Sequence, residues 1–269
     1  MSKKIIITGG LGYIGTELCK LYSGVSWHHE IKVVDNRFIS ERVNQIRNWN
    51  MDFIQGDILD KDFVKENFQD ADIVHHLAGI TDVPRVKSQA SETRDKKIIR
   101  VAEEGTQNIL DVISDKCKII FPSTHVVYEG IDKIKTEIKE DEITKPVLSY
   151  SSSKAINEKQ LKDSGKNYVI LRLGSVYGYS TDSMRIDIMP NLFSKISSQN
   201  GTLKLFASGR QIKSLVPLID VARCFKFMEE KNEITSETFN LTKDTVSVKE
   251  VAEICKKHNS KITLKETND

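Results

Sequence analysis

The sequence has no long hydrophobic run and no block of like charges. Its apolar stretches fall short of the roughly 20 residues that a helix needs to cross a bilayer, so no membrane partner is expected. The opening Met-Ser-Lys-Lys passes directly into an apolar segment, which leaves no room for a signal peptide and predicts a cytoplasmic protein. The 40 Lys and Arg residues are interspersed with 38 Asp and Glu residues, so no nucleic-acid groove is predicted.

Cysteine is scarce and has no metal-binding spacing. The four cysteines are Cys19, Cys117, Cys224 and Cys255. They are scattered, and three lie within apolar helix or strand patterns, which predicts reduced core residues. The pairs His28-His29 and His75-His76 have no cysteine or carboxylate cluster beside them, and neighbours on a strand point to opposite faces. We therefore predict no metal site.

The first positive feature is an apolar run that ends in spaced glycines. Residues 5–7 are three isoleucines, as in a strand buried on both faces of a parallel sheet. Gly9, Gly12 and Gly15 follow at regular intervals. In a dinucleotide-binding turn the first glycine permits the tight turn, the second lets the backbone approach a pyrophosphate, and the third lets helix and strand pack closely. The pattern predicts such a turn, with the phosphates at a helix N-terminus.

A second predicted strand, over residues 31–34, indicates which dinucleotide is bound. It ends in Asp35, about twenty residues after the last glycine, where a carboxylate accepts hydrogen bonds from a ribose 2′-hydroxyl. This favours NAD over NADP. Arg37 is the counter-argument, since an arginine near that strand end can accommodate a 2′-phosphate. We prefer NAD because the carboxylate stands at the strand terminus itself.

Strand and helix patterns alternate as far as Leu173. This alternation predicts an α/β fold, a Rossmann-type doubly wound parallel sheet with right-handed crossovers, in residues 1–174. Residues 175–269 are expected to form mainly a smaller substrate-binding lobe, with some segments returning to the first domain. Within this lobe Ser247-Val248-Lys249-Glu250 has the pattern of a capping box and predicts a helix start. The other predicted strands cover residues 51–55, 72–77, 117–121, 168–173, 203–206 and 215–218, and the helices cover 61–68, 98–113, 188–197 and 220–229.

Tyr150 and Lys154 form a candidate catalytic pair. Four residues apart, they share one face of a helix. A free tyrosine is a poor base near neutral pH, but an adjacent lysine cation lowers the pKa of the phenol toward the working range. Ser123 and Thr124 end the predicted strand over residues 117–121, and either hydroxyl can hold a substrate oxygen. Alone, such a Tyr-Lys pair is usually a surface pair; together with the dinucleotide turn it predicts an active site.

Taken together, these motifs resemble the extended short-chain dehydrogenase/reductase superfamily, in particular its nucleotide-sugar epimerase/dehydratase branch. The resemblance extends over almost the whole chain and is specific to the superfamily rather than to one reaction. It implies that Tyr150 is the acid/base, that Lys154 holds the nicotinamide ribose and tunes Tyr150, and that Thr124 hydrogen-bonds the reacting sugar oxygen. The matching segments are Gly9-Gly10-Leu11-Gly12-Tyr13-Ile14-Gly15, Gly56-Asp57-Ile58, His76-Leu77-Ala78-Gly79 and residues 171–178.

The resemblance also implies further binding residues and partners. Asp57 is expected to contact the adenine of NAD, and Asp35 its ribose. The other cofactor-binding residues implied are Gly9, Gly12, Tyr13, Ile14, Gly15, Asn36, Ile58, Leu77, Ala78 and Gly79, together with Tyr150 and Lys154. The implied substrate is a nucleoside-diphosphate sugar, contacted by Thr124, His125, Ser175, Arg210 and Lys213. By the same analogy we expect a homodimer that pairs the helices near residues 98–113 and 150–161.

The residues after Thr124 bear on the reaction. In relatives that eliminate water or carboxylate, an acidic residue usually follows the catalytic threonine within two positions, whereas here these positions are His125 and Val126. We therefore expect an NAD-dependent epimerase that acts through a transient keto intermediate. A keto-sugar reductase using NAD(P)H and a non-catalytic NAD-binding regulator stay open as alternatives. His125 is either a substrate-facing acid/base or a structural loop histidine.

Three positions depart from the pattern of the relatives. Lys213 stands where an arginine for the diphosphate is expected, and a lysine meets a phosphate as a point charge without the bidentate fork. Arg210 is a possible substitute. Ser175 replaces a common asparagine, and Ala102 replaces another near the nicotinamide side. These departures bear on the nucleotide and the sugar and leave the fold prediction unchanged.

Overall fold

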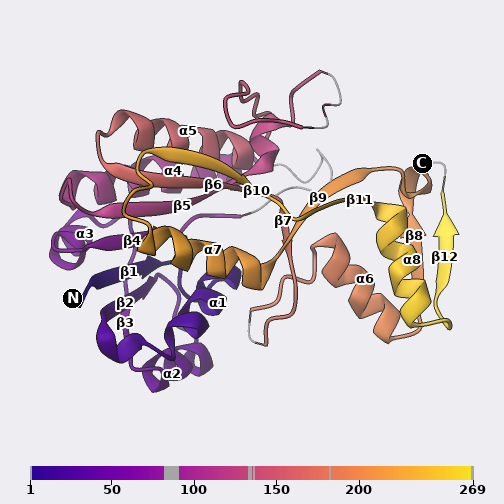
Figure 1. Ribbon diagram of the computed structural model, residues 1–269, viewed down its shortest axis with the longest axis horizontal. Helices are drawn as coiled ribbons and strands as arrows, with labels where there is room; N and C mark the ends of the chain where they lie inside the picture. Colours follow the sequence, from indigo (N-terminus) through magenta and orange to yellow (C-terminus); the bar gives the residue numbers. More distant parts are fainter. Residues whose placement is uncertain (1, 82–90, 133–134, 136, 182, 268–269) are drawn as a thin grey trace. The chain divides into compact units, whose positions relative to one another are not determined.

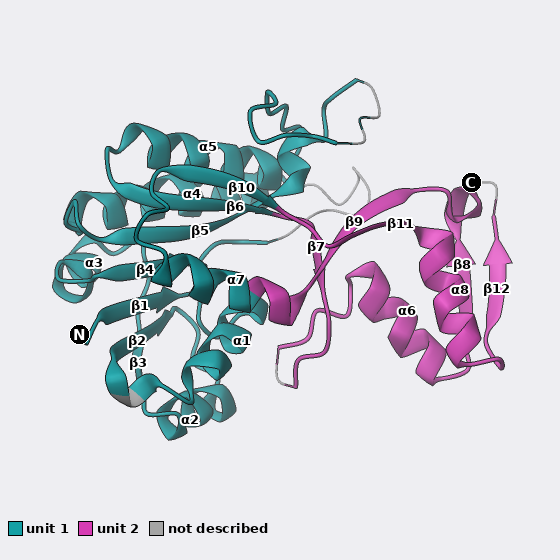
Figure 2. Ribbon diagram, in the orientation of Figure 1, with its two compact units in different colours: residues 1–172, 222–240 teal, residues 173–221, 241–269 magenta. Residues whose placement is uncertain are grey.

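The computed structural model describes residues 2–81, 91–132, 135, 137–181 and 183–267 (Figure 1). The chain divides into two compact units (Figure 2). Unit 1 contains residues 1–172 and 222–240, and unit 2 contains residues 173–221 and 241–269. Each unit has its own apolar core. Among the described residues, no helix combines the length and the apolarity required to cross a membrane.

Unit 1 is built on a seven-stranded sheet with the order β10-β6-β5-β4-β1-β2-β3. Strand β1 pairs in parallel with both β2 and β4, and the pairs β2-β3 and β4-β5 are parallel too. The strands are β1 (Lys4–Thr8), β2 (Glu30–Asp35), β3 (Asp52–Gln55), β4 (Ile73–His76), β5 (Lys118–Thr124), β6 (Asn167–Leu173) and β10 (Glu237–Leu241). The order reverses at β1, which confirms the predicted doubly wound fold. In such sheets ligands bind beside the carboxyl ends of the strands at the reversal, here β1 and β4.

Helices cover both faces of this sheet. Apolar side chains of α3 (Lys61–Phe68), α4 (Glu92–Val112) and α5 (Ser149–Asp163) form one core with sheet residues such as Ile6 and Phe121. Helices α1 (Tyr13–Tyr22) and α7 (Leu218–Glu230) meet His75, the neighbour of that core's Val74 on β4. Ile5, Ile6 and Ile7 of β1 are all buried, as predicted for a strand covered on both faces. Helix α2 (Ser40–Asn48) lies between β2 and β3 in the chain.

The described part of unit 2 is built mainly from two small sheets and two α-helices that lie wholly within it. Strand β9 (Ile212–Pro217) pairs in parallel with β7 (Ser175–Tyr177) and antiparallel with β11 (Asp244–Ser247). Strands β8 (Thr202–Leu205) and β12 (Thr263–Glu266) form a parallel pair. Their side chains pack with those of α6 (Met189–Ser198) and α8 (Val248–His258). Helix α8 begins at the predicted capping box, in which Ser247 Oγ accepts from the Glu250 amide at 3.1 Å and the Glu250 carboxylate accepts from the Ser247 amide at 2.6 Å.

Two predicted starts are wrong by three residues or more, and β5 continues three residues beyond its predicted end, to Thr124. Helix α4 begins at Glu92 rather than at residue 98. Its first six residues are polar and carry no apolar periodicity, so the sequence pattern does not reveal them as helical. Glu92 and Asp95 in that first turn complement the helix dipole. Strand β9 begins at Ile212 rather than at residue 215. Its first two side chains are exposed and only its later ones are buried, so the apolar pattern begins later than the strand.

Candidate active site

The glycine turn after β1 is closed by contacts that allow no side chain. Gly9 has a φ of +64°, and a Cβ there would lie 2.8 Å from the amide nitrogen of Ala78 beyond β4. A Cβ at Gly15 would lie 2.5 Å from the carbonyl oxygen of Gly9. The Gly12 amide donates to the same carbonyl at 2.9 Å. A Cβ at Gly12 would lie 3.0 Å from that oxygen and would meet no other part of the described chain within 4 Å. The turn is therefore tight on its inner side and open at Gly12, as a pyrophosphate requires.

Asp35, at the end of β2, is the acceptor at the centre of the predicted ribose site. Its nearly buried carboxylate accepts from the Leu11 amide of the glycine turn at 3.1 Å. Arg37 donates two hydrogen bonds to the same carboxylate, from Nε at 3.0 Å and from Nη2 at 3.2 Å. The hydrogen bond to Asp35 raises the pKa of the Arg37 guanidinium against the effect of partial burial. The two residues that the sequence offered as competing indicators of NAD and NADP are thus bonded to each other.

Asn36 and Asp57 lie together beyond the ends of β2 and β3. The side-chain Nδ2 of Asn36 donates to Asp57 Oδ2 at 3.1 Å, and Asp57 Oδ1 accepts from the backbone amide of Leu59 at 3.0 Å. The side chain of Ile58 points elsewhere. It is buried against α4, where a Cβ at Gly105 would lie 2.4 Å from it. Only the backbone of Ile58 is therefore in a position to meet a cofactor.

A chain of buried polar side chains runs from the glycine turn to helix α5. Thr8 Oγ1 accepts from the Ala78 amide at 3.0 Å and lies 3.1 Å from His76 Nδ1. His76 Nε2 lies 2.9 Å from Thr106 Oγ1, which accepts from the side-chain Nδ2 of Asn157 at 2.8 Å. Burial, assisted by the charge of Lys154, lowers the pKa of the His76 imidazole to about 3. His76 is therefore neutral at physiological pH and links β1, β4 and α4, while Asn157 completes the link to α5.

The other predicted cofactor residues surround this chain. Leu77 and Ala78 are half-buried directly after β4, and Gly79 has open space where a Cβ would stand. Tyr13 is buried at the start of α1, and Ile14 is half-buried beside it. Small residues after β4 thus face the tight inner side of the glycine turn.

The predicted catalytic residues lie on β5 and α5. Thr124 is the last residue of β5, and its Oγ1 accepts from the Val126 amide at 3.2 Å. Tyr150 is in the first turn of α5, and Lys154 lies one turn later with its ammonium 4.5 Å from the ring centre of Phe121 on β5. Burial lowers the pKa of Lys154 to about 8, although the nearby Glu158 acts in the opposite direction. Lys154 is therefore mostly charged at neutral pH.

Ser123, the alternative hydroxyl, is engaged in structural support. It is buried, and its Oγ donates to Glu158 Oε1 at 2.5 Å. The same carboxylate accepts from Arg172 Nε at 2.9 Å and Nη2 at 2.7 Å. This arrangement leaves Thr124 as the hydroxyl suited to a substrate oxygen.

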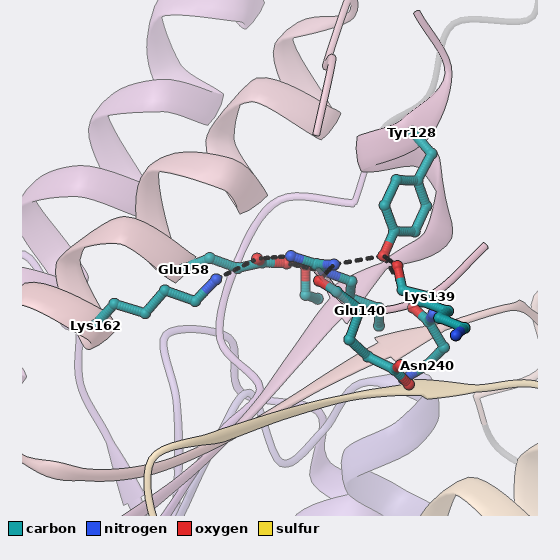
Figure 3. Close-up of polar contacts among 8 residues, drawn as sticks. Tyr128, Lys139, Glu140, Glu158, Lys162 and Asn240 are labelled. Carbon is teal, nitrogen blue, oxygen red and sulfur yellow. Dashed lines mark hydrogen bonds and ion pairs between the residues drawn. The ribbon is translucent and has the colours of Figure 1, made fainter. Parts of the chain in front are cut away.

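Arg172 extends this buried network away from α5. Its Nη1 donates to the hydroxyl of Tyr128 and, at 2.9 Å, to the carbonyl oxygen of Glu140. The Tyr128 hydroxyl lies 3.2 Å from Asn240 Oδ1 (Figure 3). The network therefore connects α5, β6, the segment around residue 140 and β10, all within unit 1.

The predicted substrate residues are divided between the two units. His125 is half-buried at the start of the short helix η3 (His125–Tyr128) in unit 1. Ser175 on β7 and Lys213 on β9 belong to neighbouring strands of one sheet in unit 2. Arg210 follows η4 (Phe206–Gly209), and both Arg210 and Lys213 are exposed. Unit 2 thus brings Ser175 and Lys213 onto the same small sheet.

Sequence reasoning missed the residues that support the site. Glu158 carries a usable signal, because it follows Lys154 by four residues and therefore shares its helix face. Arg172 lies inside a quoted motif, but its partner is fourteen residues away. Glu129 accepts from donors 18 to 22 residues further along the chain, and no periodic pattern marks it.

Comparisons with known proteins agree with this architecture. A sequence model of the family described as "NAD dependent epimerase/dehydratase family" matches residues 5–242. UDP-N-acetyl-alpha-D-glucosaminuronate decarboxylase of Bacillus cytotoxicus is 28% identical over 267 residues, which cover 94% of this chain and 79% of that protein. Human dTDP-D-glucose 4,6-dehydratase is 28% identical over 279 residues, covering 96% and 76%. The crystal structure of UDP-glucuronic acid 4-epimerase from Bacillus cereus, in complex with UDP-glucuronic acid and NAD, is 25% identical and has a TM-score of 0.81, covering 98% and 85%.

Proposed function

The chain belongs to the NAD-dependent epimerase/dehydratase family of extended short-chain dehydrogenases/reductases, and we propose that it epimerises a nucleoside-diphosphate sugar. Its cofactor is NAD. The observation that carries the proposal is the arrangement of Thr124 at the end of β5 with Tyr150 and Lys154 on α5, on the sheet that bears the glycine turn. His125 and Val126 occupy the two positions where eliminating relatives usually have an acid, which favours epimerisation over elimination.

The cofactor residues are those of the glycine turn and of the ends of β2 to β4. The open side of Gly12 and the N-terminus of α1 suit a pyrophosphate, and Asp35 suits a ribose. Arg37 must release at least part of the Asp35 carboxylate when ribose hydroxyls donate to it, which its half-exposed side chain allows. When bound, NAD supplies a reversible acceptor for hydride.

Tyr150 is the proton acceptor in this proposal. Its phenolate takes the proton of a sugar hydroxyl as the hydrogen on the same carbon leaves as hydride, so that the C–O bond becomes a carbonyl. Thr124 holds that oxygen through a hydrogen bond. Lys154 keeps a positive charge beside the phenolate. After the keto sugar has rotated in the site, hydride returns to the other face of its carbonyl group. Tyr150 then gives the proton back to the oxygen, which leaves the enzyme unchanged.

Lys213 and Arg210 are the proposed contacts for the diphosphate, because both are exposed cations on or beside β9. We expect Lys213→Ala to raise KM for a nucleoside-diphosphate sugar with little effect on kcat. An unchanged KM would remove Lys213 from the site. The predicted homodimer is a separate proposal, tested by light scattering, where a monomeric mass would contradict it.

A keto-sugar reductase is the second candidate. Residues 123–130 favour it, because Ser-Thr-His-Val-Val-Tyr-Glu-Gly also resembles the corresponding stretch of deoxysugar reductases. A reductase consumes NAD(P)H stoichiometrically, whereas an epimerase recycles its cofactor. The two candidates therefore differ in whether product formation requires added reductant.

The test begins with the small molecules released from freshly purified, denatured protein, identified by mass spectrometry. Stoichiometric NAD or NADH supports the epimerase, and the protein is then incubated with a panel of UDP- and dTDP-sugars without added cofactor. We expect Tyr150→Phe to reduce turnover by about 10²- to 10⁴-fold, while Tyr168→Phe, on the core of unit 1, keeps it. Turnover retained in Tyr150→Phe, or product formed only with added NAD(P)H, would overturn the epimerase.

A further inference from the structure

Glu129 collects three hydrogen bonds at the start of helix α5. Its Oε1 accepts from the backbone amides of Val147, at 2.7 Å, and Leu148, at 2.8 Å. The same oxygen accepts from the hydroxyl of Ser151. Glu129 follows η3 directly, whereas its three donors lie at the entrance to α5. One carboxylate thus joins two segments that are far apart in sequence.

Backbone contacts hold these two segments at close range. The Gly130 amide donates to the Lys145 carbonyl at 2.9 Å, and the Lys145 amide donates to the Val127 carbonyl at 2.8 Å. A Cβ at Gly130 would lie 2.6 Å from the Lys145 carbonyl oxygen, so a side chain there would force the segments apart. The hydrogen bonds of Glu129 to Val147, Leu148 and Ser151 extend these contacts from Lys145 to the first turn of α5.

The N-cap residue of α5 is Leu148, which has no polar side chain. Its amide donates to Ser151 Oγ at 3.1 Å as well as to Glu129. The amides of Val147 and Leu148 directly precede the first turn of the helix, and a carboxylate beside a helix N-terminus is favourable as a negative charge. Glu129 supplies this charge from another element. It fixes Leu148 and Ser151, the residues on either side of Ser149 and Tyr150.

The other end of the link is Thr124. Helix η3 begins directly after it, and Thr124 Oγ1 accepts from the Val126 amide. A short, internally bonded stretch therefore connects Thr124 to Glu129, and Glu129 connects to the turn that carries Tyr150. We infer that Glu129 is a positioning residue, which fixes the Tyr150 phenol relative to the Thr124 hydroxyl. This inference rests on the proposed function, since it assigns both groups to the same substrate oxygen.

The decisive comparison is between Glu129→Ala and Glu129→Gln. Alanine removes the acceptor, whereas glutamine keeps an Oε1 that can receive all three hydrogen bonds. Misplacing a reacting group by about 1 Å can cost about 10²-fold, so we expect Glu129→Ala to lower kcat by about 10- to 100-fold. KM for the nucleoside-diphosphate sugar should change by less than about threefold, because the binding residues are not altered. Glutamine should restore most of kcat.

A matched control is Glu142→Ala, which removes a carboxylate paired with Lys135 in the excursion between η3 and α5. It should leave kcat unchanged. The inference is overturned if Glu129→Ala keeps wild-type kcat, if its loss lies in KM alone, or if Glu129→Gln is as impaired as Glu129→Ala.

Hydrogen exchange of the same variants separates this inference from the proposed function. We expect exchange at the amides of residues 147–152 to accelerate by more than about tenfold in Glu129→Ala, with glutamine close to wild type and the C-terminal half of α5 unchanged. If the wild-type protein has no epimerase activity but shows this exchange pattern, the proposed function fails while the link between Glu129 and α5 stands. Unchanged exchange in Glu129→Ala overturns the inference whatever the activity.

Discussion

Arg172 on β6 and Glu158 on α5 form a buried, bidentate ion pair. The guanidinium donates to both carboxylate oxygens, at 2.9 and 2.7 Å, and the two side chains are only 2% and 4% exposed. Ser123, the neighbour of Thr124, donates to the same carboxylate. Because Glu158 is one turn beyond Lys154, its bond with Ser123 ties the strand that carries Thr124 to the helix that carries Lys154, and its pair with Arg172 ties the same helix to β6.

Removing one member of the pair should be costly. Glu158→Ala leaves the Arg172 guanidinium buried without its counter-charge, and breaking buried pairs in this way typically costs about 3–5 kcal/mol of unfolding free energy. Denaturant titration measures the loss. Asp163→Ala, which removes an exposed pair with Lys159 on the same helix, is the control and should cost far less. Equal losses in the two variants would contradict the argument.

A second buried cluster predicts a dependence of stability on pH. Glu229 on α7 accepts from the Tyr22 hydroxyl and lies 3.2 Å from His75 Nε2. Burial raises the pKa of the Glu229 carboxyl, but hydrogen bonds from His75 and Tyr22 outweigh it and lower that pKa from 4.5 to about 2. A carboxyl whose pKa is lower in the folded state stabilises the fold above its unfolded pKa, and this contribution is lost as the pH falls.

The measurement compares Glu229→Gln with wild type by denaturant titration at several pH values. The wild type should be more stable by an amount that is constant above about pH 5 and shrinks between about pH 4.5 and pH 2. Glu230→Gln, next to it on the same helix, should show a much smaller change with pH. A difference between wild type and Glu229→Gln that stays constant down to pH 2 would contradict the assignment.

The glycine turn, Asp35 and the Tyr150-Lys154 pair could be predicted from sequence because their physical causes are local. Gly15 is fixed by a steric contact within the turn and Gly9 by its positive φ, and the Tyr-Lys spacing follows from the pitch of one helix. The bond between Asp35 and Arg37 was in reach as well, since the residues are two apart. In the sequence the two residues indicate alternative cofactors, and in the fold they are hydrogen-bonded partners.

The supporting residues were not predictable in the same way. The partners of Glu129 and Glu158 become neighbours only when separate elements are packed, and hydrophobic periodicity says nothing about which buried carboxylate meets which donor. Strand β10 is not predicted for a related reason, since it contains the polar Asn240 and forms no apolar run. The backbone amide of Asn240 donates to the Glu140 side chain, which lies far away in the sequence. The polar first turn of α4 hid its start in the same manner.

Lys154 predicts the alkaline limit of activity. Burial lowers its pKa to about 8, so the ammonium is charged below that pH and loses its proton as the pH rises through it. Because the charge favours the Tyr150 phenolate, we expect kcat of the proposed reaction to fall above about pH 8. Lys154→Arg keeps a cation that does not titrate in this range, so its alkaline limit should disappear, although its kcat at pH 7 is lower. Lys159→Arg, exposed on the same helix, should keep the wild-type profile. A shared alkaline limit in wild type and Lys154→Arg would assign it to another group.

Unit 2 carries a strained turn that a single substitution should relax. Ala207 and Ser208 in η4 have φ of +46° and +53°, and Gly209 follows at +69°, so three successive residues are left-handed just before Arg210. A left-handed conformation costs a residue with a Cβ roughly 1 kcal/mol or more, and glycine avoids this cost. Ala207→Gly should therefore raise the free energy of unfolding of unit 2 by up to about 1 kcal/mol, less the extra entropy that glycine gives the unfolded chain. Ala102→Gly, inside α4, should lower stability by about 0.5–1 kcal/mol, because glycine has no compensating relief in a right-handed helix. Opposite signs in the two variants, measured by denaturant titration, identify strain at residue 207; a loss of stability in both would mean that the turn holds Ala207 without strain.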